Sequence, residues 1–434
     1  MVLPQSRPVV ADHSLTSWLA RLQSAHPAEI VLGLERVAAV WAVLQGQLRG
    51  DPNKPFGAAP VVAVAGTNGK GSTVAALEAL ARGHGLRVGC YSSPHLLRFN
   101  ERVRIDGSDI DDGALVAALE QVERARGAIA LTFFEHTTLA ALVIFAGQAL
   151  DLVVLEVGLG GRLDAVNIVD ADLSIVTSID LDHQAFLGTT RAAIAVEKLG
   201  IARANRPLVI GECDHPDGFI AAVAATEARP LWLGNDFFCE PQGAGGWRYR
   251  DSDLALAPLE RGPLLPENLA LAIAAYRQLR LPFEAGIAAQ SLRQLRVAGR
   301  QQRLYYRGRE LLLDVAHNPA SCRQLAASLT AAGQPAVAVA SAFADKDFAA
   351  MAAPLLALIG QWWLGPIRDN PRAADAHKLA QLLYNDGARA TVCESLPAAL
   401  QQAIVESPPD CLIVVLGSFM VVAEVLSVVA EESA

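Results

Sequence analysis

The sequence predicts an α/β fold: a P-loop nucleotide-binding domain on a mostly parallel sheet, followed by a smaller Rossmann-like α/β domain. Three observations predict it. Short apolar runs alternate with segments of helical periodicity along most of the chain, and a glycine-rich turn with a lysine follows the first of these runs. The length of 434 residues also exceeds what one hydrophobic core usually covers. We place the domain boundary between residues 297 and 298.

The first domain begins its sheet at residues 61–65, a β-rich run followed by the glycine-rich turn and a helix over about residues 72–83. Three later runs are short, apolar and flanked by helical patterns, and we predict them as buried strands at 152–156, 173–178 and 207–210. Such alternation is typical of a parallel sheet with helices on both faces. Residues 229–260 predict an antiparallel edge, and a helix over 267–279 follows.

The second domain follows a connector at residues 295–303, and its strands are predicted at 311–315, 336–340, 362–365, 390–393 and 412–416. The most membrane-like stretch of the chain, residues 411–430, lies at its end. Gly417, Ser418 and Glu424 interrupt that stretch, so we predict a buried strand, a turn and an amphipathic helix rather than a membrane span.

Composition and charge narrow the classes of function. The chain has 36 basic and 45 acidic residues and a net charge of −9, which argues against a nucleic-acid or anionic-membrane binder. Its six cysteines are scattered without any C-x-x-C pair, which favours reduced thiols over disulfides or a zinc site. The N-terminus lacks the long apolar region of a secretory signal. We therefore expect a cytoplasmic protein, taken as a monomer, whose partners are small molecules.

The strongest local signal is the glycine-rich segment at residues 65–73, AGTNGKGST, between a predicted strand and a predicted helix. Glycines let successive backbone N–H groups face one oxyanion, and the helix N-terminus adds positive potential. Lys70 is placed to reach terminal phosphates, and the Ser72 hydroxyl to hold Mg²⁺. The usual loop requires glycine where this chain has Val64, and serine or threonine where it has Gly71, so this is a variant loop. The alternative, a plain capped turn, fits the pattern less well.

Glu156 is a candidate metal ligand because it ends a predicted strand just before a glycine cluster, residues 158–161. Carboxylates at the carboxyl end of a parallel sheet, near a phosphate loop, suit Mg²⁺. Local sequence leaves open that Glu156 only caps the next turn. His183 and Lys198 taken alone would be an ordinary turn histidine and a solvated helical lysine.

Many short segments, in order, resemble one family. They are residues 32–37 (LGLERV), the glycine-rich loop, 92–96 (SSPHL), 100–104 (NERVR), 134–135, 155–164 (LEVGLGGRLD), 167–170, 181–183 (LDH), 197–198, 314–319 (DVAHNP), 345–347 (DKD) and 417–419. Over nearly the whole chain the sequence resembles the dihydrofolate synthase/folylpolyglutamate synthase family, relatives of the Mur ligases. The resemblance implies ATP-dependent ligation of L-glutamate to dihydropteroate and to reduced folates through an acyl phosphate, with ATP as co-substrate.

Other functions remain as alternatives. A monofunctional folylpolyglutamate synthase is the nearest, and a Mur-type peptidoglycan ligase fits less well because the SSPH and Phe-Glu segments resemble the folate branch. A nucleotide-dependent switch would explain the loop and Glu156 but would give no role to Asp314, His317 and Ser418 in the second domain. A folate-binding protein without activity is disfavoured by the intact Lys70, Ser72 and Glu156.

The resemblance assigns roles residue by residue. The expected nucleotide site is Gly66, Thr67, Asn68, Gly69, Lys70, Gly71, Ser72, Asn268, Arg300 and Asp314. The expected ligands of two Mg²⁺ ions are Ser72, Ser93, Glu156, His183 and, if carbamylated, Lys198. The expected catalytic residues are Lys70, Lys198 and His317. On local grounds Asn268 could be a first-turn helix residue, Arg300 a surface arginine, and Asp314 part of a capped turn.

The expected pteroate site comprises Ile30, Val31, Leu32, Thr132, Phe133, Phe134, Glu135, Leu163, Asp164 and Ala165. An aromatic such as Phe134 can stack on a flat ring, although both phenylalanines precede a helix with core spacing and could equally be core residues. The resemblance places the incoming glutamate at His317 and Ser418. Many relatives have a histidine where this chain has Met420, so no role of that histidine transfers.

Overall fold

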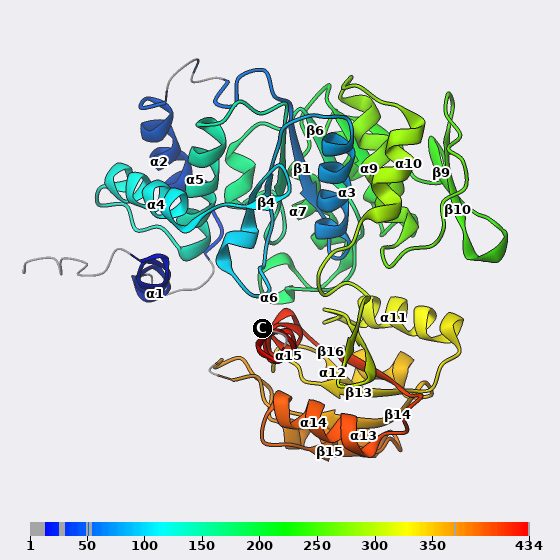
Figure 1. Cartoon of the computed structure of the whole chain (residues 1–434). Helices are drawn as coiled ribbons and strands as arrows, with labels where there is room; N and C mark the ends of the chain where they lie inside the picture. The colour runs from blue at the N-terminus through cyan, green and yellow to red at the C-terminus, as the bar shows by residue number, and fades with distance from the viewer. Residues whose placement is uncertain (1–13, 26–30, 49–50, 52–53, 369, 433–434) are drawn as a thin grey trace, which may run out of the picture.

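The chain folds around two separate β-sheets. The computed structural model describes residues 14–25, 31–48, 51, 54–368 and 370–432. Residues 61–232 contribute one eight-stranded sheet and residues 302–416 a six-stranded sheet, in the upper and lower bodies of Figure 1. A parallel α/β architecture in two bodies is therefore confirmed.

The upper sheet has the strand order β4-β3-β2-β5-β1-β6-β7-β8. Its central strands β1 and β5 are buried along their whole length because helices cover both faces of the sheet. All neighbours run parallel except the pairs β2–β3 and β3–β4. The strands are β1 Val61–Ala65, β2 Val88–Tyr91, β3 Val103–Ile105, β4 Ser108–Asp109, β5 Leu152–Glu156, β6 Leu173–Val176, β7 Pro207–Ile210 and β8 Arg229–Trp232.

Helices cover this sheet in three groups, each burying an apolar face. One group packs on the side chains of Val62, Val64 and their neighbours, and comprises α3 Lys70–Gly83, α9 Pro266–Gln278 and α10 Ala285–Gln294. The second packs on the opposite face and comprises α1 Leu15–Ala25, α2 Glu35–Gln45, α4 Asp112–Arg126 and α5 Phe133–Ala146. The third lies near β6 and β7 and comprises α6 Gln184–Leu187, α7 Arg191–Leu199 and α8 Phe219–Ala225.

The prediction of an antiparallel edge within residues 229–260 is wrong for the main sheet. The edge strand β8 pairs parallel with β7, because helix α8 forms the crossover between them. Strands β9 (Phe237–Pro241) and β10 (Trp247–Asp251) are antiparallel, but they form a separate two-stranded sheet. The antiparallel edge of the main sheet lies at the other end, in β3 and β4.

The lower sheet has the order β11-β12-β16-β13-β14-β15 and is parallel except for the β11–β12 hairpin. Its strands are β11 Gln302–Tyr306, β12 Arg309–Leu313, β13 Ala336–Ala340, β14 Ile359–Leu364, β15 Ala390–Val392 and β16 Leu412–Leu416. Its helices are α11 Pro319–Ala332, α12 Phe348–Ala352, α13 Ala376–Asn385, α14 Leu396–Glu406 and α15 Phe419–Glu431. Short 3₁₀ turns complete the elements: η1 Phe99–Arg102, η2 Ala165–Ile168, η3 Gly243–Gly245 and η4 Ala353–Leu355.

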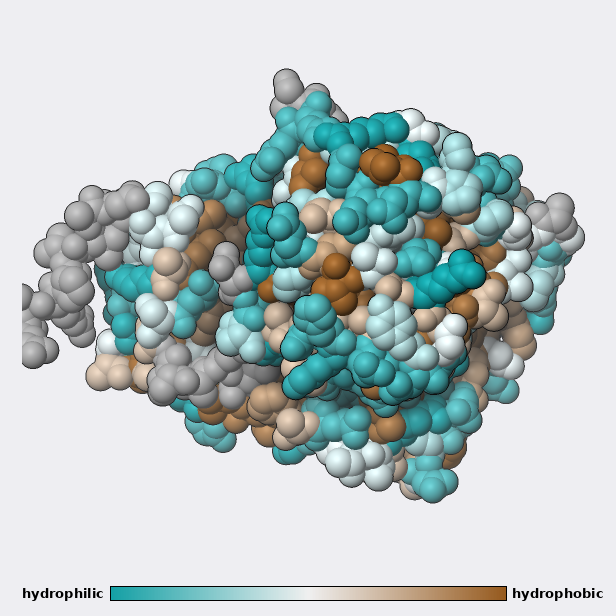
Figure 2. Space-filling view, turned by 90° about the horizontal axis from the view of Figure 1, so that it is seen from below, coloured by the Kyte–Doolittle hydropathy of each residue, from teal (hydrophilic) through white to brown (hydrophobic). Residues whose placement is uncertain are grey.

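The apolar C-terminal stretch folds as predicted, into strand β16, a turn and helix α15. Among the described residues, no helix has both the length and the apolar character needed to cross a bilayer. Seen from below, the surface is largely hydrophilic with small separate hydrophobic patches (Figure 2).

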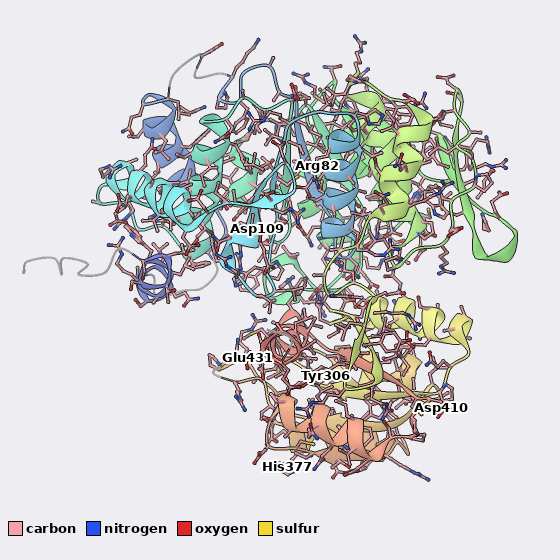
Figure 3. The ribbon with its side chains drawn as sticks, viewed as in Figure 1. Arg82, Asp109, Tyr306, His377, Asp410 and Glu431 are labelled. Carbon is pink, nitrogen blue, oxygen red and sulfur yellow. The ribbon has the colours of Figure 1, made fainter. Side chains whose placement is uncertain are left out.

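The two bodies are joined by the segment between α10 and β11, and the boundary predicted at residues 297/298 falls within it. Arg82 on α3 and Asp109 on β4 lie in the upper body, whereas Tyr306, at the end of β11, already lies in the lower one (Figure 3). Helices α11 and α15 of the lower body lie below the end of the upper body that carries α6 (Figure 1). Elements from both bodies therefore meet at one seam.

Candidate active site

Two adjoining cavities lie at this seam. The first, of about 100 Å³, is lined by the glycine-rich loop, Glu156 and Lys198 from the upper body and by His317 and Phe419 from the lower body. The second, of about 60 Å³, is lined by Ser72 and Asn268 on one side and Asp314 on the other. Arg300, on the connector, lines both cavities. The two bodies thus build the site jointly.

The glycine-rich loop links β1 to α3, and its shape requires glycine at two positions. Gly66 has φ +156°, and a Cβ there would collide with the Thr177 hydroxyl. Gly69 has φ +89°, and a Cβ there would collide with the Asn268 side chain. The helix begins directly after it, at Lys70, two residues earlier than the sequence predicts.

Part of the loop's backbone is already used to anchor it. The N–H of Thr67 donates to the Ser178 carbonyl oxygen at 2.7 Å, and the N–H of Asn68 donates to the Ser178 hydroxyl at 3.0 Å. The Thr177 hydroxyl donates to the Asn68 carbonyl oxygen at 2.6 Å. We therefore expect a bound phosphate at the N-terminus of α3, from Gly69 onward.

Lys70 is the first residue of α3, and its side chain folds back onto the preceding loop. Its ammonium donates to the carbonyl oxygens of Gly66 at 2.9 Å and Thr67 at 3.4 Å. Burial lowers the pKa of Lys70, and the charges of Glu156 and Asp182 oppose that shift. The lysine is thus held at the cavity wall by two uncharged carbonyl oxygens, which an anionic phosphate can replace.

The five expected metal ligands divide between the cavities. Ser93, Glu156, His183 and Lys198 line the first cavity, whereas Ser72 is buried in the first turn of α3 and lines the second. A Cβ on Gly71 would lie 3.6 Å from Glu156 Oε2 and 2.9 Å from Arg300 Nη2, so the helix start adjoins both groups.

The chemistry of these residues fits a hard divalent cation. Glu156 is 3% exposed, and the hydrogen bond it accepts at this site comes from the Ser93 N–H at 3.4 Å. Burial raises the pKa of Glu156, while Lys70 and Arg300 oppose the shift. Within the described part of the chain, no three His, Cys, Asp or Glu side chains gather closely enough to hold a metal ion. Only Glu156 and His183 of the expected set belong to those types, and the other expected ligands are two serine hydroxyls and Lys198.

Lys198, near the end of α7, is 3% exposed, and burial lowers its pKa to about 7. The reading of it as a solvated lysine is therefore wrong. A buried amine with such a pKa is largely neutral near pH 7.5, as a nucleophilic amine must be. Burial likewise lowers the pKa of His183 to about 4, which leaves its imidazole neutral and able to act as a ligand.

Around the second cavity, Asn268 lies in the first turn of α9 and is 8% exposed, and its amide adjoins Gly69. Asp314 follows β12 and holds the connector: its carboxylate accepts from the N–H of Gln301 at 3.1 Å and of Ala316 at 2.9 Å. Burial raises the pKa of Asp314 to about 6 despite these donors. Asp314 thus fixes the backbone at Gln301, next to Arg300, and this contact holds the connector along the cavity.

The two expected glutamate ligands are placed differently. His317 lines both cavities, and its ring lies 6.2 Å from the Phe419 ring, centroid to centroid. Ser418 is 2% exposed, and its hydroxyl caps α15 by accepting from the Val421 N–H at 3.2 Å. Ser418 lines neither of the two cavities. Met420 contacts the Asn370 amide through its sulfur.

None of the expected pteroate residues that the structure describes lines either cavity, but Asp164 accepts the N–H of Leu159, which lines the first one. A Cβ on Gly158 would lie 2.7 Å from Phe134 and 3.2 Å from the Asp164 carboxylate, and the Gly33 N–H donates to the Leu163 carbonyl oxygen at 3.4 Å. Both Phe133 and Phe134 are half-buried and pack against the core, so only part of each side chain is accessible to a ligand. Val31, Leu32 and Ala165 belong to the same segments, and Ile30 lies outside the described residues.

Three of these residues have structural tasks of their own. Thr132 and Glu135 form a capping box at the start of α5, and Glu135 also pairs with Arg36 at 2.8 Å. Asp164 accepts backbone N–H bonds from Gly158, Leu159 and Val166, and burial raises its pKa to about 6. Their side chains shape this region by holding its loops together.

Sequence reasoning missed Asp182, Leu159, Gly160, Pro94, Leu187 and Phe419, all of which line the first cavity. Asp182 is the most informative of these, because its carboxylate contacts Lys346 and lies 3.5 Å from His317 Nε2. Burial opposes its ionisation, but the hydrogen bond from His317 and the charge of Lys346 hold its pKa far below the usual range. The segment 180–183, Asp-Leu-Asp-His, follows shortly after a buried strand, and its three polar residues were the signal that could have identified Asp182.

The chain is similar to known proteins over nearly its whole length. Residues 299–419 match the family described as Mur ligase, glutamate ligase domain. The dihydrofolate synthase/folylpolyglutamate synthase of Escherichia coli K12 is 39% identical over 422 residues, which cover 96% of each chain. The structure of E. coli FolC in complex with DHPP and ADP superposes with a TM-score of 0.91 at 36% identity, covering 99% of this chain and 100% of that one.

A second solved structure is similarly close. It is a bifunctional folylpolyglutamate synthase/dihydrofolate synthase with Mn, AMPPNP and L-glutamate bound, with a TM-score of 0.86 at 37% identity. The match covers 96% of this chain and 98% of that one.

Proposed function

Because the chain belongs to the dihydrofolate synthase/folylpolyglutamate synthase family, within the Mur ligases, we propose that it uses ATP to join L-glutamate to dihydropteroate and to reduced folates. One observation carries the proposal. The phosphate loop and Lys198 of the upper body face His317 of the lower body across a single cavity. A nucleotide-dependent switch would not need the lower-body residues there.

The reaction must first make a carboxylate electrophilic. An oxygen of the pteroate carboxylate attacks the γ-phosphorus of ATP, the bond to the ADP oxygen breaks, and an acyl phosphate forms. This step needs in-line positioning and charge neutralisation more than covalent chemistry. Lys70 at the loop and Arg300 on the connector are the cations placed to supply it. Asn268 and Asp314 would fix the rest of the nucleotide in the second cavity.

The amine of glutamate then attacks the acyl carbon. The tetrahedral intermediate collapses to the amide, inorganic phosphate leaves, and the attacking nitrogen loses its proton. His317 lies where the two cavities adjoin and is the lower-body group placed to orient this amine or receive its proton. The Ser418 hydroxyl caps α15, so Ser418 would contribute to the glutamate site by fixing the turn before that helix.

We propose two Mg²⁺ ions as cofactors, one held by Ser72 and Glu156 and the other by Ser93, His183 and carbamylated Lys198. When bound, such ions neutralise phosphate charge. In this buried site, burial favours the neutral form of Lys198, whereas the charges of Lys70 and Arg300 favour the ionised form of Glu156 against the effect of burial.

Carbamylation of Lys198 gives a prediction with two readouts. Its neutral amine attacks CO₂, forming an N–C bond and releasing a proton. We expect intact-mass and peptide spectra of CO₂-equilibrated enzyme to carry one carbamate at Lys198, and CO₂-depleted enzyme to regain activity on adding bicarbonate. At fixed dissolved CO₂, the rate of regain should rise as the pH passes through about 7, because burial lowers the pKa of Lys198 to that value and only the neutral amine reacts. An active, CO₂-equilibrated enzyme with unmodified Lys198 would exclude the carbamate.

Placement of the pteroate ring beside Phe134 gives a second prediction. In Phe134→Ala we expect the KM for dihydropteroate to rise about tenfold, the scale of losing one aromatic stacking contact, with the KM for ATP changed less than twofold. Phe238→Ala is the matched control, because Phe238 is also half-buried but lies on β9 and lines neither cavity. Equal increases in both KM values for Phe134→Ala would show that this residue serves folding only.

We propose that residues 1–297 bind ATP and pteroate and that residues 298–434 bind glutamate. A monomer as the working unit is part of this proposal. All six cysteines are free, which supports the reducing cytoplasm as the compartment. The net charge of −9 supports small-molecule partners rather than nucleic acid or membranes.

The decisive experiment is mass spectrometry of the products formed from ATP, L-glutamate and either dihydropteroate or tetrahydrofolate. We expect a glutamylated product from both acceptors, and transfer of ¹⁸O from the pteroate carboxylate into the released phosphate. A product from tetrahydrofolate alone would favour the monofunctional folylpolyglutamate synthase. Phosphate release that does not depend on acceptor and glutamate would favour a switch.

A further inference from the structure

Asp182 lies in the upper body, and its carboxylate accepts the N–H of the neighbouring His183 at 2.8 Å, yet its side-chain partners come from the lower body. Its Oδ1 pairs with the Lys346 ammonium. Its Oδ2 lies 3.5 Å from His317 Nε2 and 3.4 Å from the Asn318 amide nitrogen. Both Asp182 and Lys346 have side chains only 9% exposed, so the pair is largely shielded from water. One carboxylate therefore contacts three side chains from the other body.

Other contacts run along the same seam but differ in kind. Asn68 and Asn318 exchange amide hydrogen bonds at 3.2 and 2.9 Å, which tie the phosphate loop to the start of α11. Arg323 pairs with Asp180 at 3.1 Å, and the Arg323 side chain is 60% exposed. Only the Asp182 contacts in this set combine opposite charges with burial, and a buried pair is far more sensitive to loss of one partner than an exposed pair.

The contacts of His317 show how Asp182 contributes to the site. The imidazole is held at both nitrogens, with Nδ1 2.8 Å from the Val315 carbonyl oxygen and Nε2 facing Asp182. The first contact lies within the lower body and fixes the ring relative to its own strand. The second crosses the seam and fixes it relative to the cavity. Without Asp182, nothing on the upper-body side in this set of contacts defines where the imidazole lies.

We propose that Asp182 is a positioning residue that docks His317 at the cavity, with Lys346 as its counter-charge, so that the glutamate-dependent step depends on it while acyl phosphate formation does not. This inference rests on the proposed ligase function. The cations we assign to acyl phosphate formation are Lys70 and Arg300. Backbone carbonyl oxygens of the glycine-rich loop hold Lys70, and Arg300 is placed through Gln301 and Asp314.

Asp182→Asn tests this by separating the two steps, because it removes the charge and keeps the size. With glutamate present, we expect kcat/KM for glutamate to fall about 50-fold, a typical scale for misplacing a general base. With ATP and dihydropteroate but no glutamate, reversible acyl phosphate formation scrambles an ¹⁸O label from the β–γ bridge of ATP into its β-phosphate. We expect that scrambling to stay within about threefold of wild type.

Lys346→Met tests the same contact from the lower body, so the proposal can be decided even if one variant folds poorly. It should reproduce the split between ligation and scrambling. The double variant should be no worse than the poorer single variant, because the two residues act as one unit. Arg323→Ala is the matched control, since it removes an exposed pair on the same seam, and both readouts should stay within about twofold.

Two outcomes would overturn the proposal. One is an equal loss of scrambling and ligation in Asp182→Asn, and the other is losses in the two single variants that multiply in the double variant. Absence of any glutamylated product from the wild-type enzyme is a separate result. It would overturn the ligase function itself, and this inference with it.

Discussion

Lys70→Ala should abolish both ATP binding and ligation. The ammonium is the loop's own cation, and it is held by only two carbonyl oxygens that a phosphate can displace. Losing a preorganised cation at a transferring phosphoryl group costs about 10²–10³-fold in kcat, or about 3–4 kcal/mol of transition-state stabilisation. The measurement is the steady-state rate of ADP formation together with the Kd for ATP by calorimetry.

The matched control is Lys378→Ala, which removes an exposed lysine from α13 in the lower body. It should leave turnover within about twofold, as expected for a surface change far from the site. If Lys70→Ala kept ATP binding and turnover intact, the glycine-rich segment would be a structural turn, and the nucleotide site would have to be sought elsewhere.

Glu156→Gln should remove activity while leaving the fold as stable as wild type or more so. The carboxylate is buried at the cavity and accepts the Ser93 N–H there, and we propose that its negative charge serves a cation. Loss of such a ligand should reduce kcat at least about 100-fold, the scale seen for a single electrostatic group in a closed site. ATP titrations at several Mg²⁺ concentrations would follow the loss.

The stability prediction for Glu156→Gln follows from the direction of its pKa. Burial raises the pKa of Glu156 in the folded state, so protonation favours the fold, and the ionised form above that pKa destabilises it. A neutral glutamine removes this cost, so we expect Tm at pH 7.5 to be unchanged or raised. The advantage should shrink as the pH falls and the wild-type carboxyl becomes protonated. A Tm well below that of wild type, with activity lost in parallel, would indicate a packing role for Glu156. Glu156→Asp, which keeps the charge, should retain part of the activity.

Strand positions were predictable because buried parallel strands are short continuous apolar runs. The strands 61–65, 152–156, 207–210, 336–340 and 412–416 were predicted with the bounds that the structure has. The edges were less predictable, because β3, β4 and β11 are half-exposed and carry too few apolar residues to be recognised. The same reason explains the error at residues 229–260, where the side chains of β8 face partly outward.

The amino-acid sequence was sufficient to identify the glycine-rich loop, the two alternating blocks and the family, since each depends on residues adjacent along the chain. The tertiary structure alone decided which residues face each other across the seam. Lys198, expected to be solvated on local grounds, is buried because α7 packs near the sheet, and Asp182 meets Lys346 although 164 positions separate them. Local pattern carries information on burial within one element, but a charge's partner and its exclusion from water depend on how the two bodies pack, which no short segment encodes.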